Sequence, residues 1–268
     1  MPAVDIDPQY EDFYFPASHL YTAGYNGPGR SNLMAYSAKQ ELILPSDYAK
    51  EIQRADESKA TLDYAITYNK DQGQEGSCVG NGTTTACEVV SVFQFGIDAY
   101  APLSAISLYD QIGESAQSGA VVMDALDAMI RNGCLPLDTP QNKARFEHTH
   151  PATGFKSRYP SGYQKTAKQF RIDECLRIDS FGAMVTALLR GHPVVVGREG
   201  HCIVYLRVIN KNGALKFIYK NSWGDWGFGS GDMPNGFGAD SERLAQVACR
   251  GAFAVCTMVV PEFYANAA

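Results

Sequence analysis

Residues 71–78 read DQGQEGSC, and the largely apolar stretch VGNGTTTACEVVSVFQF follows them. That stretch suits a buried helix ending at Gly96, because glycine is a common residue just past a helix end. Cys78 would then lie where the helix begins, where the helix dipole and nearby N–H groups stabilise a thiolate. Gln72 can fold back across the glycine-rich turn, so that its side-chain amide donates to an oxyanion beside the Cys78 N–H. Taken alone, such a cysteine is more often a buried structural residue.

Two later segments contain partners for this cysteine. GHCIVY (200–205) opens an apolar strand with His201, and KNSWGDWG contains Asn221 and Trp223. NKNG at 210–213 is typical of a hairpin turn, so the flanking strands are predicted to be antiparallel neighbours that place Asn221 beside His201. An asparagine carbonyl that accepts the imidazole N–H fixes the tautomer without adding charge. An apolar Trp223 beside the pair would shield that hydrogen bond from water.

The segments QGQEGSC, GHCIVY and KNSWGDWGFG together resemble, in the same order, the three active-site blocks of the papain/cathepsin cysteine protease family. The intervals from the cysteine to the histidine and the asparagine are also close to the family's range. The resemblance implies roles for five residues: Cys78 as nucleophile, His201 as base and acid, Asn221 as the residue that orients the histidine, Gln72 in the oxyanion hole, and Trp223 as a supporting shield.

Weaker similarity extends the likeness over roughly residues 61–268. LSAISLYDQ and ALDAMIRNGCLPLD look like the family's second and third helices, and RGAFAVCTMVVPEF looks like its closing strand. The resemblance implies an α+β, papain-like two-lobed fold with the active site between the lobes. We expect a helical N-terminal lobe at about 61–150 and an antiparallel, β-barrel-like C-terminal lobe at about 151–268. Residues 1–60 form an N-terminal extension, either pro-segment-like or an assembly arm.

Local patterns favour the same class. Apolar residues at helical spacing come first in the chain and apolar strands come later, which fits an α+β protein. Pro and Gly punctuate residues 134–170, which are therefore predicted as loop. A short helix is expected after Ser46. Further helix is expected within 103–133 and over 180–191, and strands over 193–197, 201–209, 214–221 and 250–260.

The sequence departs from the family pattern at four places. Glu75 stands where a disulfide cysteine is usual, and Val79 stands where tryptophan usually follows the nucleophile. Only Arg198, Glu199 and Gly200 separate the PVVVG strand from His201, where relatives carry a longer loop that shapes the cleft. The extension lacks the long helical pattern of the usual propeptide. Substrate preference therefore does not carry over from the family.

Composition limits the partners and the compartment. The 268 residues are 45% hydrophobic with a net charge of -6, and they contain no long basic run, so nucleic acid is not expected as a partner. Neither a signal peptide nor a membrane-spanning stretch is expected. The seven cysteines are odd in number and include no CxxC pair, which indicates reduced thiols. We therefore expect a location in the cytoplasm or within a virus particle.

Other candidate residues are interpreted as structural. The Pro-rich loop contains three residues of metal-ligating type, Glu147, His148 and His150, but no matching partner cluster, so no metal or cofactor is expected. His192 is expected to be a helix cap or surface residue, and Cys87 and Cys202 are expected to pack in the core.

The leading interpretation is a cysteine endopeptidase that hydrolyses peptide bonds in a protein or peptide substrate. A second interpretation is a papain-like module with a structural or interaction role in a larger assembly, such as a virus particle, with its site latent. A third is a thiol acyl transferase or isopeptidase.

Overall fold

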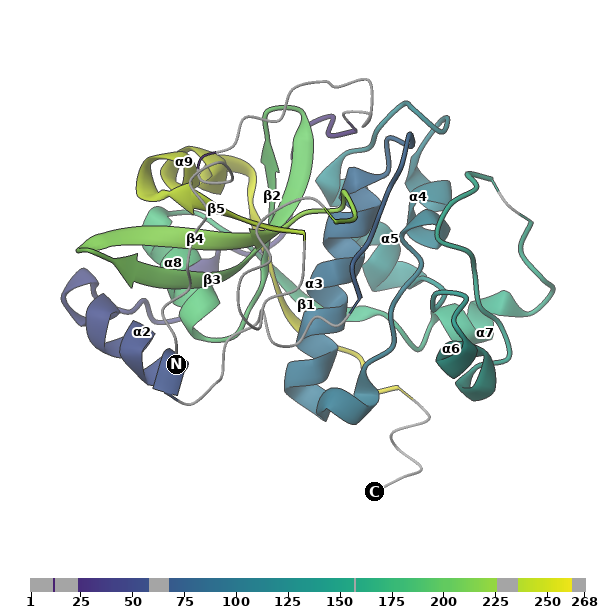
Figure 1. Ribbon diagram of the computed structural model, residues 1–268, viewed down its shortest axis with the longest axis horizontal. Coiled ribbons are helices and arrows are strands. Elements are labelled where there is room, and N and C mark those ends of the chain that lie inside the picture. Colours follow the sequence, from purple (N-terminus) through teal and green to yellow (C-terminus); the bar gives the residue numbers. More distant parts are fainter. Residues whose placement is uncertain (1–11, 13–23, 58–67, 157, 226–235, 262–268) are drawn as a thin grey trace.

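The computed structural model describes residues 12, 24–57, 68–156, 158–225 and 236–261. Figure 1 shows a β-sheet with several helices on one side of the molecule and a group of helices on the other, with helix α3 between them. Most of residues 1–23, the start of the expected catalytic domain at 61–67, and the end of the KNSWGDWGFG block lie outside the described residues.

The helical lobe is built around α3, which runs from Cys78 to Phe95 and ends at Gly96 as predicted. The loop prediction for 134–170 is wrong in part, because two short helices, α6 and α7, form there. Thr139 caps α6 by accepting a hydrogen bond from the Asn142 N–H, and Pro140 suits its first position. The lobe comprises α3 (Cys78–Phe95), η4 (Ile97–Ala99), α4 (Ala105–Ile112), α5 (Val122–Arg131), α6 (Pro140–Arg145) and α7 (Tyr163–Ala167).

The sheet lobe contains a six-stranded antiparallel sheet in the order β1-β6-β2-β3-β4-β5. Its edge strands β1 and β5 do not pair with each other among the described residues, so the sheet stays open rather than closing into a barrel. The predicted hairpin at 210–213 is confirmed, with Asn212 and Gly213 both at positive φ. The lobe comprises β1 (Ile172–Arg177), α8 (Phe181–Leu189), β2 (Val194–Arg198), β3 (His201–Lys211), β4 (Ala214–Lys220), β5 (Phe237–Ser241), α9 (Glu242–Ala248), η5 (Cys249–Gly251) and β6 (Phe253–Met258).

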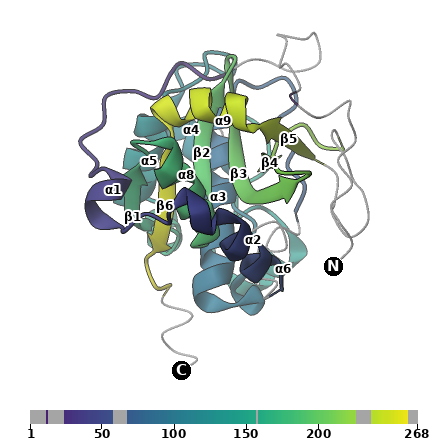
Figure 2. The same ribbon diagram turned by 90° about the vertical axis from the view of Figure 1, so that its left-hand side faces the viewer.

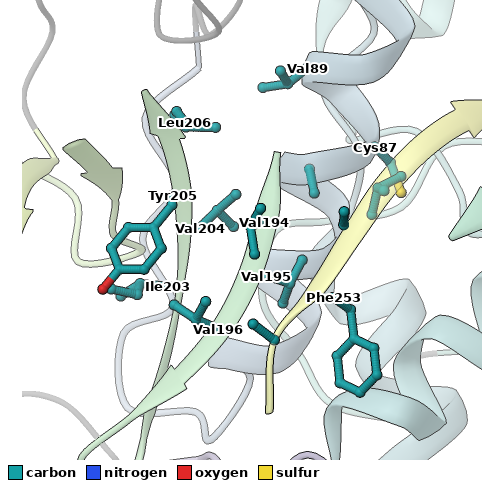
Figure 3. Packing of buried hydrophobic residues seen from close by; sticks show 14 of the residues in the cluster. Cys87, Val89, Val194, Val195, Val196, Ile203, Val204, Tyr205, Leu206 and Phe253 are labelled. Atoms are coloured by element: carbon teal, nitrogen blue, oxygen red, sulfur yellow. The ribbon is translucent and has the colours of Figure 1, made fainter. Parts of the chain in front are cut away.

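Helix α3 packs against β3 and β6, which joins the two lobes through one apolar core. Figure 3 shows Cys87 of α3 beside strand β6, and Val194 and Val195 of β2 next to the same helix. This packing explains the glycines in the first turns of the helix. A Cβ at Gly82 would lie 3.0 Å from the Cys202 sulfur, and one at Gly80 would lie 2.7 Å from the Ala105 carbonyl oxygen. The close approach of these neighbouring atoms therefore explains why glycine stands at positions 80 and 82 despite its low helix propensity.

The N-terminal extension packs its helix α2 against β3 and α8 of the sheet lobe (Figure 2). It contains α1 (Tyr36–Lys39), η2 (Pro45–Asp47) and α2 (Tyr48–Glu57), and α2 is the helix predicted after Ser46. The buried Tyr36 hydroxyl forms a 2.9 Å hydrogen bond with Nδ1 of His192. His192 takes part in the C-terminal cap of α8, because its N–H donates to the Ala187 carbonyl at 2.9 Å, and the extension covers its side chain.

A buried ion pair links the start of the described catalytic region to α3. The Lys70 ammonium lies 2.8 Å from a Glu88 carboxylate oxygen, and both side chains are almost completely buried. The same Glu88 oxygen accepts the Leu103 N–H at 2.7 Å. Removing one member of such a pair leaves an uncompensated charge in the interior.

We predict that Glu88→Gln lowers the free energy of unfolding by about 3–5 kcal/mol, because Lys70 stays buried without its carboxylate. The matched control is Asp127→Asn, which removes an exposed pair with Arg131 and should cost only about 0.3–0.5 kcal/mol. Urea unfolding followed by circular dichroism measures both. A loss for Glu88→Gln no larger than that of the control would contradict the prediction.

Candidate active site

A tight turn between β2 and β3 places His201. Arg198 and His201 are paired across the hairpin, and only Glu199 and Gly200 lie between them. Both turn residues have positive φ, 55° and 79°, which is the conformation that two-residue hairpins favour. The short loop that departs from the family pattern therefore still delivers His201 as the first residue of β3.

A register shift in the next hairpin places Asn221. From Lys211 to Arg207 the β3–β4 pairing runs in one register, and between Arg207 and Tyr205 it slips by one residue. Side chains alternate faces along a strand, so without this slip the residue after β4 would lie opposite Val204, on the wrong face. With it, Asn221 shares the face of His201, and its Oδ1 lies 2.7 Å from the imidazole Nε2. Because that oxygen can only accept, Nε2 carries the hydrogen.

A second strand pairing brings in Gln72. The segment before the nucleophile pairs with the segment after β4: the Gln72 N–H donates to the Ser222 carbonyl and the Gly224 N–H to that of Lys70, both at 2.9 Å. The Gln72 side-chain oxygen accepts from the Ser222 hydroxyl at 2.6 Å. One of its amide hydrogens donates to the Glu75 carbonyl at 2.8 Å. These bonds fix the side-chain amide next to the turn that leads to Cys78.

Trp223 lies against the histidine as the sequence predicts. Its ring centroid is 4.7 Å from that of His201, with the planes inclined by 35°. Only 6% of the residue is exposed. The indole therefore helps to keep water from the bond between His201 and Asn221.

Cys78 is the first residue of α3 and has no solvent exposure. Burial raises the pKa of its thiol to about 12. This effect outweighs the backbone hydrogen bonds from Cys202, which follows His201, and from Gly24, which act to lower the pKa. Burial likewise lowers the pKa of His201 to about 4, opposed by the hydrogen bond to Asn221. Burial thus favours a neutral thiol at Cys78 and a neutral imidazole at His201.

The residues that bury Cys78 are not among those that the sequence singled out as a site. Gly24 and the residues after it, 24–29, pass between the lobes, and we call this stretch the cover segment. The Ala120 N–H donates to the Gly24 carbonyl at 2.7 Å, and the Asn26 N–H donates to the Ala120 carbonyl at 2.9 Å. On the other side the Tyr25 N–H donates to the Gly200 carbonyl at 3.0 Å. The cover segment is thereby hydrogen-bonded to both lobes.

Further along, the cover segment caps a helix. The carbonyls of Gly27 and Pro28 accept the N–H groups of Val122 and Met123, each at 3.2 Å. These donors belong to the first turn of α5, whose N-cap residue supplies no side-chain hydrogen bond. The cover segment therefore satisfies backbone donors that a helix start leaves without intrahelical partners.

A buried charge pair lies behind the histidine. The Arg198 guanidinium contacts the Asp240 carboxylate, which also accepts the Tyr205 hydroxyl at 2.5 Å. The positive charge of Arg198 adds to the lowering of the His201 pKa. This pair could not be predicted from the sequence, because Arg198 and Asp240 are far apart in the chain.

No protein-family model matches the sequence. No curated protein matches it either. Solved structures do match: procathepsin L 3 of the Tenebrio molitor larval midgut superposes with a TM-score of 0.59 at 19% identity, over 87% of this chain and 76% of that one.

Xylellain, a cysteine protease from Xylella fastidiosa, matches with a TM-score of 0.56 at 16% identity, over 91% of this chain and 99% of that one. Bromelain from Ananas comosus, solved in complex with the E64 inhibitor, matches with a TM-score of 0.53 at 18% identity, over 75% and 97%. This chain has a papain-like fold. The fold class predicted from the three sequence blocks is confirmed.

The residues considered as metal ligands do not gather into a site. His150 is buried, with its Nδ1 3.1 Å from the Ser104 hydroxyl, and its ring stacks on Tyr159. Among the described residues there is no group of three or more side chains that could hold a metal ion. Within the same residues, no helix has both the length and the apolar character needed to cross a bilayer.

The contact between His201 and Asn221 yields a prediction about charge. Asn221→Asp replaces a neutral acceptor by a carboxylate, which favours the imidazolium and should raise the pKa of His201 from about 4 to about 5–7. Titration of the ring ¹⁵N signals by NMR measures the change. His192, which bonds Tyr36 instead, is the internal control and should titrate alike in both proteins. An unchanged His201 titration would contradict this role for Asn221.

Proposed function

We propose that the chain is a cysteine peptidase that hydrolyses peptide bonds, with Cys78 as nucleophile and His201 as proton carrier. The observation that carries the proposal is the position of Cys78 at the start of α3, hydrogen-bonded by the backbone of the residue after His201. Nε2 of His201 donates a 2.7 Å hydrogen bond to the Asn221 side-chain oxygen, so the other ring nitrogen, Nδ1, is the one that can accept a proton. The papain-like fold supports the same chemistry.

The first half of the reaction forms an acyl-enzyme. His201 takes the thiol proton at Nδ1, the Cys78 thiolate attacks the peptide carbonyl carbon, and the carbonyl electrons move onto oxygen. The Cys78 N–H and the Gln72 side-chain amide donate to that oxyanion. Collapse of the intermediate breaks the C–N bond, and His201 gives its proton to the departing amine.

The second half restores the enzyme. Water enters, His201 takes one of its protons, and the resulting hydroxide attacks the thioester carbonyl. The C–S bond breaks, the acid product leaves, and the imidazolium and thiolate are ready for another cycle. Throughout, Trp223 shields the bond that Asn221 makes to the imidazolium, which keeps the ring in place.

We further propose that the extension is pro-segment-like and that its cover segment holds the enzyme latent. Gly24 directs its N–H to the Cys78 sulfur while its carbonyl is bonded to Ala120, so it presents no carbonyl of its own for attack. A Cβ at Gly24 would lie 2.1 Å from the Gly76 carbonyl oxygen, so only glycine fits there. Several of the matching structures are proforms or precursors, including procathepsin L 3.

The covered thiol also favours the second interpretation, an interaction module whose site stays latent. The two differ in what happens once the cover segment is displaced: a peptidase gains activity, whereas a purely structural module does not. The acyl transferase alternative shares the first half of the reaction and differs in whether water or an amine takes the acyl group. Product masses distinguish these two.

Cys78→Ala should abolish hydrolysis of fluorescent casein, since Cys78 supplies the sulfur of the proposed thioester. Cys87→Ala is the matched control, because Cys87 is equally buried in the same helix but faces the core. Both variants are compared in the background of the activating substitution below. Turnover that persists without Cys78 would refute the scheme.

Gly24→Ala should raise casein hydrolysis by about tenfold or more, because a clash worth only about 1.4 kcal/mol shifts the closed–open equilibrium by that factor. Arg30→Ala is the control: Arg30 is exposed, lies just beyond the cover segment, and should leave the rate unchanged. If Gly24→Ala and Arg30→Ala behave alike, the cover segment does not hold the enzyme latent.

A further inference from the structure

Residues 154–156, in the loop between α6 and α7, direct three successive backbone N–H groups at two carboxylates, and we call this stretch the nest loop. The N–H groups of Gly154 and Phe155 both donate to Oε1 of Glu75, at 2.9 and 3.2 Å. The next N–H, that of Lys156, donates to the Asp110 carboxylate. Gly154 and Lys156 have positive φ, 108° and 58°. Successive N–H groups in such a turn form a concavity that binds anions, and here the Glu75 carboxylate occupies it.

The nest loop is itself anchored on helix α4. The ring of Phe155 packs against that of Tyr109, with the centroids 5.2 Å apart. Asp110, which accepts the last N–H of the nest loop, also accepts the Tyr159 hydroxyl at 3.0 Å. Both α4 residues are buried. The loop therefore gives the Glu75 side chain a fixed point of attachment.

The main chain of Glu75 contacts Gln72, the residue expected to stabilise the oxyanion. The Glu75 N–H donates to the Gln72 carbonyl at 3.2 Å, and the Glu75 carbonyl accepts the Gln72 side-chain amide at 2.8 Å. One residue thus joins the Gln72 amide, through its main chain, to the nest loop, through its side chain. A shift of the Glu75 backbone would move the acceptor that holds this amide.

We propose that Glu75 is a positioning residue: its carboxylate, held by the nest loop, fixes the turn before Cys78 and so directs the second amide hydrogen of Gln72 at the oxyanion. This inference rests on the function proposed above. Glu75 stands where family members usually carry a disulfide cysteine, and all seven cysteines of this chain are free. Charge-assisted hydrogen bonds from two N–H groups supply the corresponding fixation without a covalent bond.

This role differs from general structural support in the step that it affects. Iodoacetamide loses iodide from a saturated carbon and forms no oxyanion, so its reaction with Cys78 reports on the Cys78–His201 pair alone. Hydrolysis of a peptide bond requires that pair and the oxyanion donors as well. Loss of Glu75 should therefore slow hydrolysis and leave alkylation unchanged, whereas general damage to the site would slow both.

The test compares Glu75→Ala and Glu75→Gln in the full chain that carries Gly24→Ala, with fluorescent casein as the substrate. Glu75→Ala should lower kcat by about tenfold to a hundredfold and change KM by less than about threefold. Glu75→Gln should restore kcat to within about threefold, because its amide oxygen can accept the same two N–H groups. Alkylation of Cys78 by iodoacetamide should proceed at one rate in all these proteins.

The matched control for these measurements is Glu114→Ala, which removes an exposed glutamate and should alter neither rate. A kcat for Glu75→Ala equal to that of the control would overturn the proposal. A fall in alkylation parallel to the fall in kcat would also overturn it, since Glu75 would then support the whole site.

A double-mutant cycle determines whether Glu75 acts through Gln72. Gln72→Ala removes the amide, so that adding Glu75→Ala to it should lower kcat by no more than about a further twofold. Losses that multiply would show that Glu75 acts independently of Gln72 and would overturn the proposal.

A second readout needs no turnover. In ¹⁵N NMR spectra the side-chain amide signals of Gln72 should shift or broaden in Glu75→Ala and stay in place in Glu75→Gln and Glu114→Ala. Unchanged Gln72 signals in Glu75→Ala would overturn the positioning role whatever the kinetics. Shifted signals, together with absence of hydrolysis in every protein including the one that retains Glu75, would support the positioning role and refute the proposed function.

Discussion

The short antiparallel pairing between residues 70–72 and 222–224 is the constraint on which the candidate site depends. The first of these segments leads into the turn before Cys78, and the second follows directly from the strand that positions Asn221. The hydrogen bonds between them hold residues 70–72, which lead into the helical lobe, beside residues 222–224, which follow β4 of the sheet lobe. Because the site lies where the lobes meet, a change in this pairing would move Gln72 and Asn221 together.

Two buried lysines, Lys70 and Lys220, flank that pairing. The Lys70 ammonium at one end is neutralised by Glu88 on α3. Lys220, just before Asn221, is also buried, and burial together with the nearby Lys70 charge lowers its pKa to about 7. Its Nζ lies 2.7 Å from the Asn69 side-chain oxygen and over the ring of Phe237. A lysine that gives up its proton readily avoids a second full positive charge beside the same carboxylate.

The same low-dielectric surroundings explain why a reactive pair can be inert. A thiolate and an imidazolium attract each other, but each loses hydration when the cover segment closes over them, and burial then favours the two neutral forms. In the mechanism proposed above, displacing Gly24 and Tyr25 would admit water and substrate together. Latency would then need only coverage of the site and no distortion of it.

Much of the fold could be predicted because local signals agreed with one another. The apolar stretch after Cys78, the stop at Gly96 and the Asn212-Gly213 turn each indicated an element that the structure contains. The one-residue slip between Arg207 and Tyr205 could not be predicted, since register depends on packing across strands. The role of the cover segment could not be predicted, because it arises from contacts with residues that are distant in the chain, among them Cys78, Ala120 and Gly200. Helix α6 was missed because Pro and Gly outweighed the cap at Thr139, and α7 was missed because it follows Gly162 and has no side-chain cap.

The central claim, that Cys78 and His201 act as one ionisable pair once uncovered, is tested most directly by the pH dependence of Cys78 alkylation in the Gly24→Ala chain. Iodoacetamide labelling is followed by mass spectrometry of the Cys78 peptide, with and without His201→Ala. The account predicts rapid labelling that sets in well below the ordinary thiol pKa of about 8.5, and a shift of this onset to alkaline pH when His201 is removed. Labelling that rises only at alkaline pH in both proteins would contradict it.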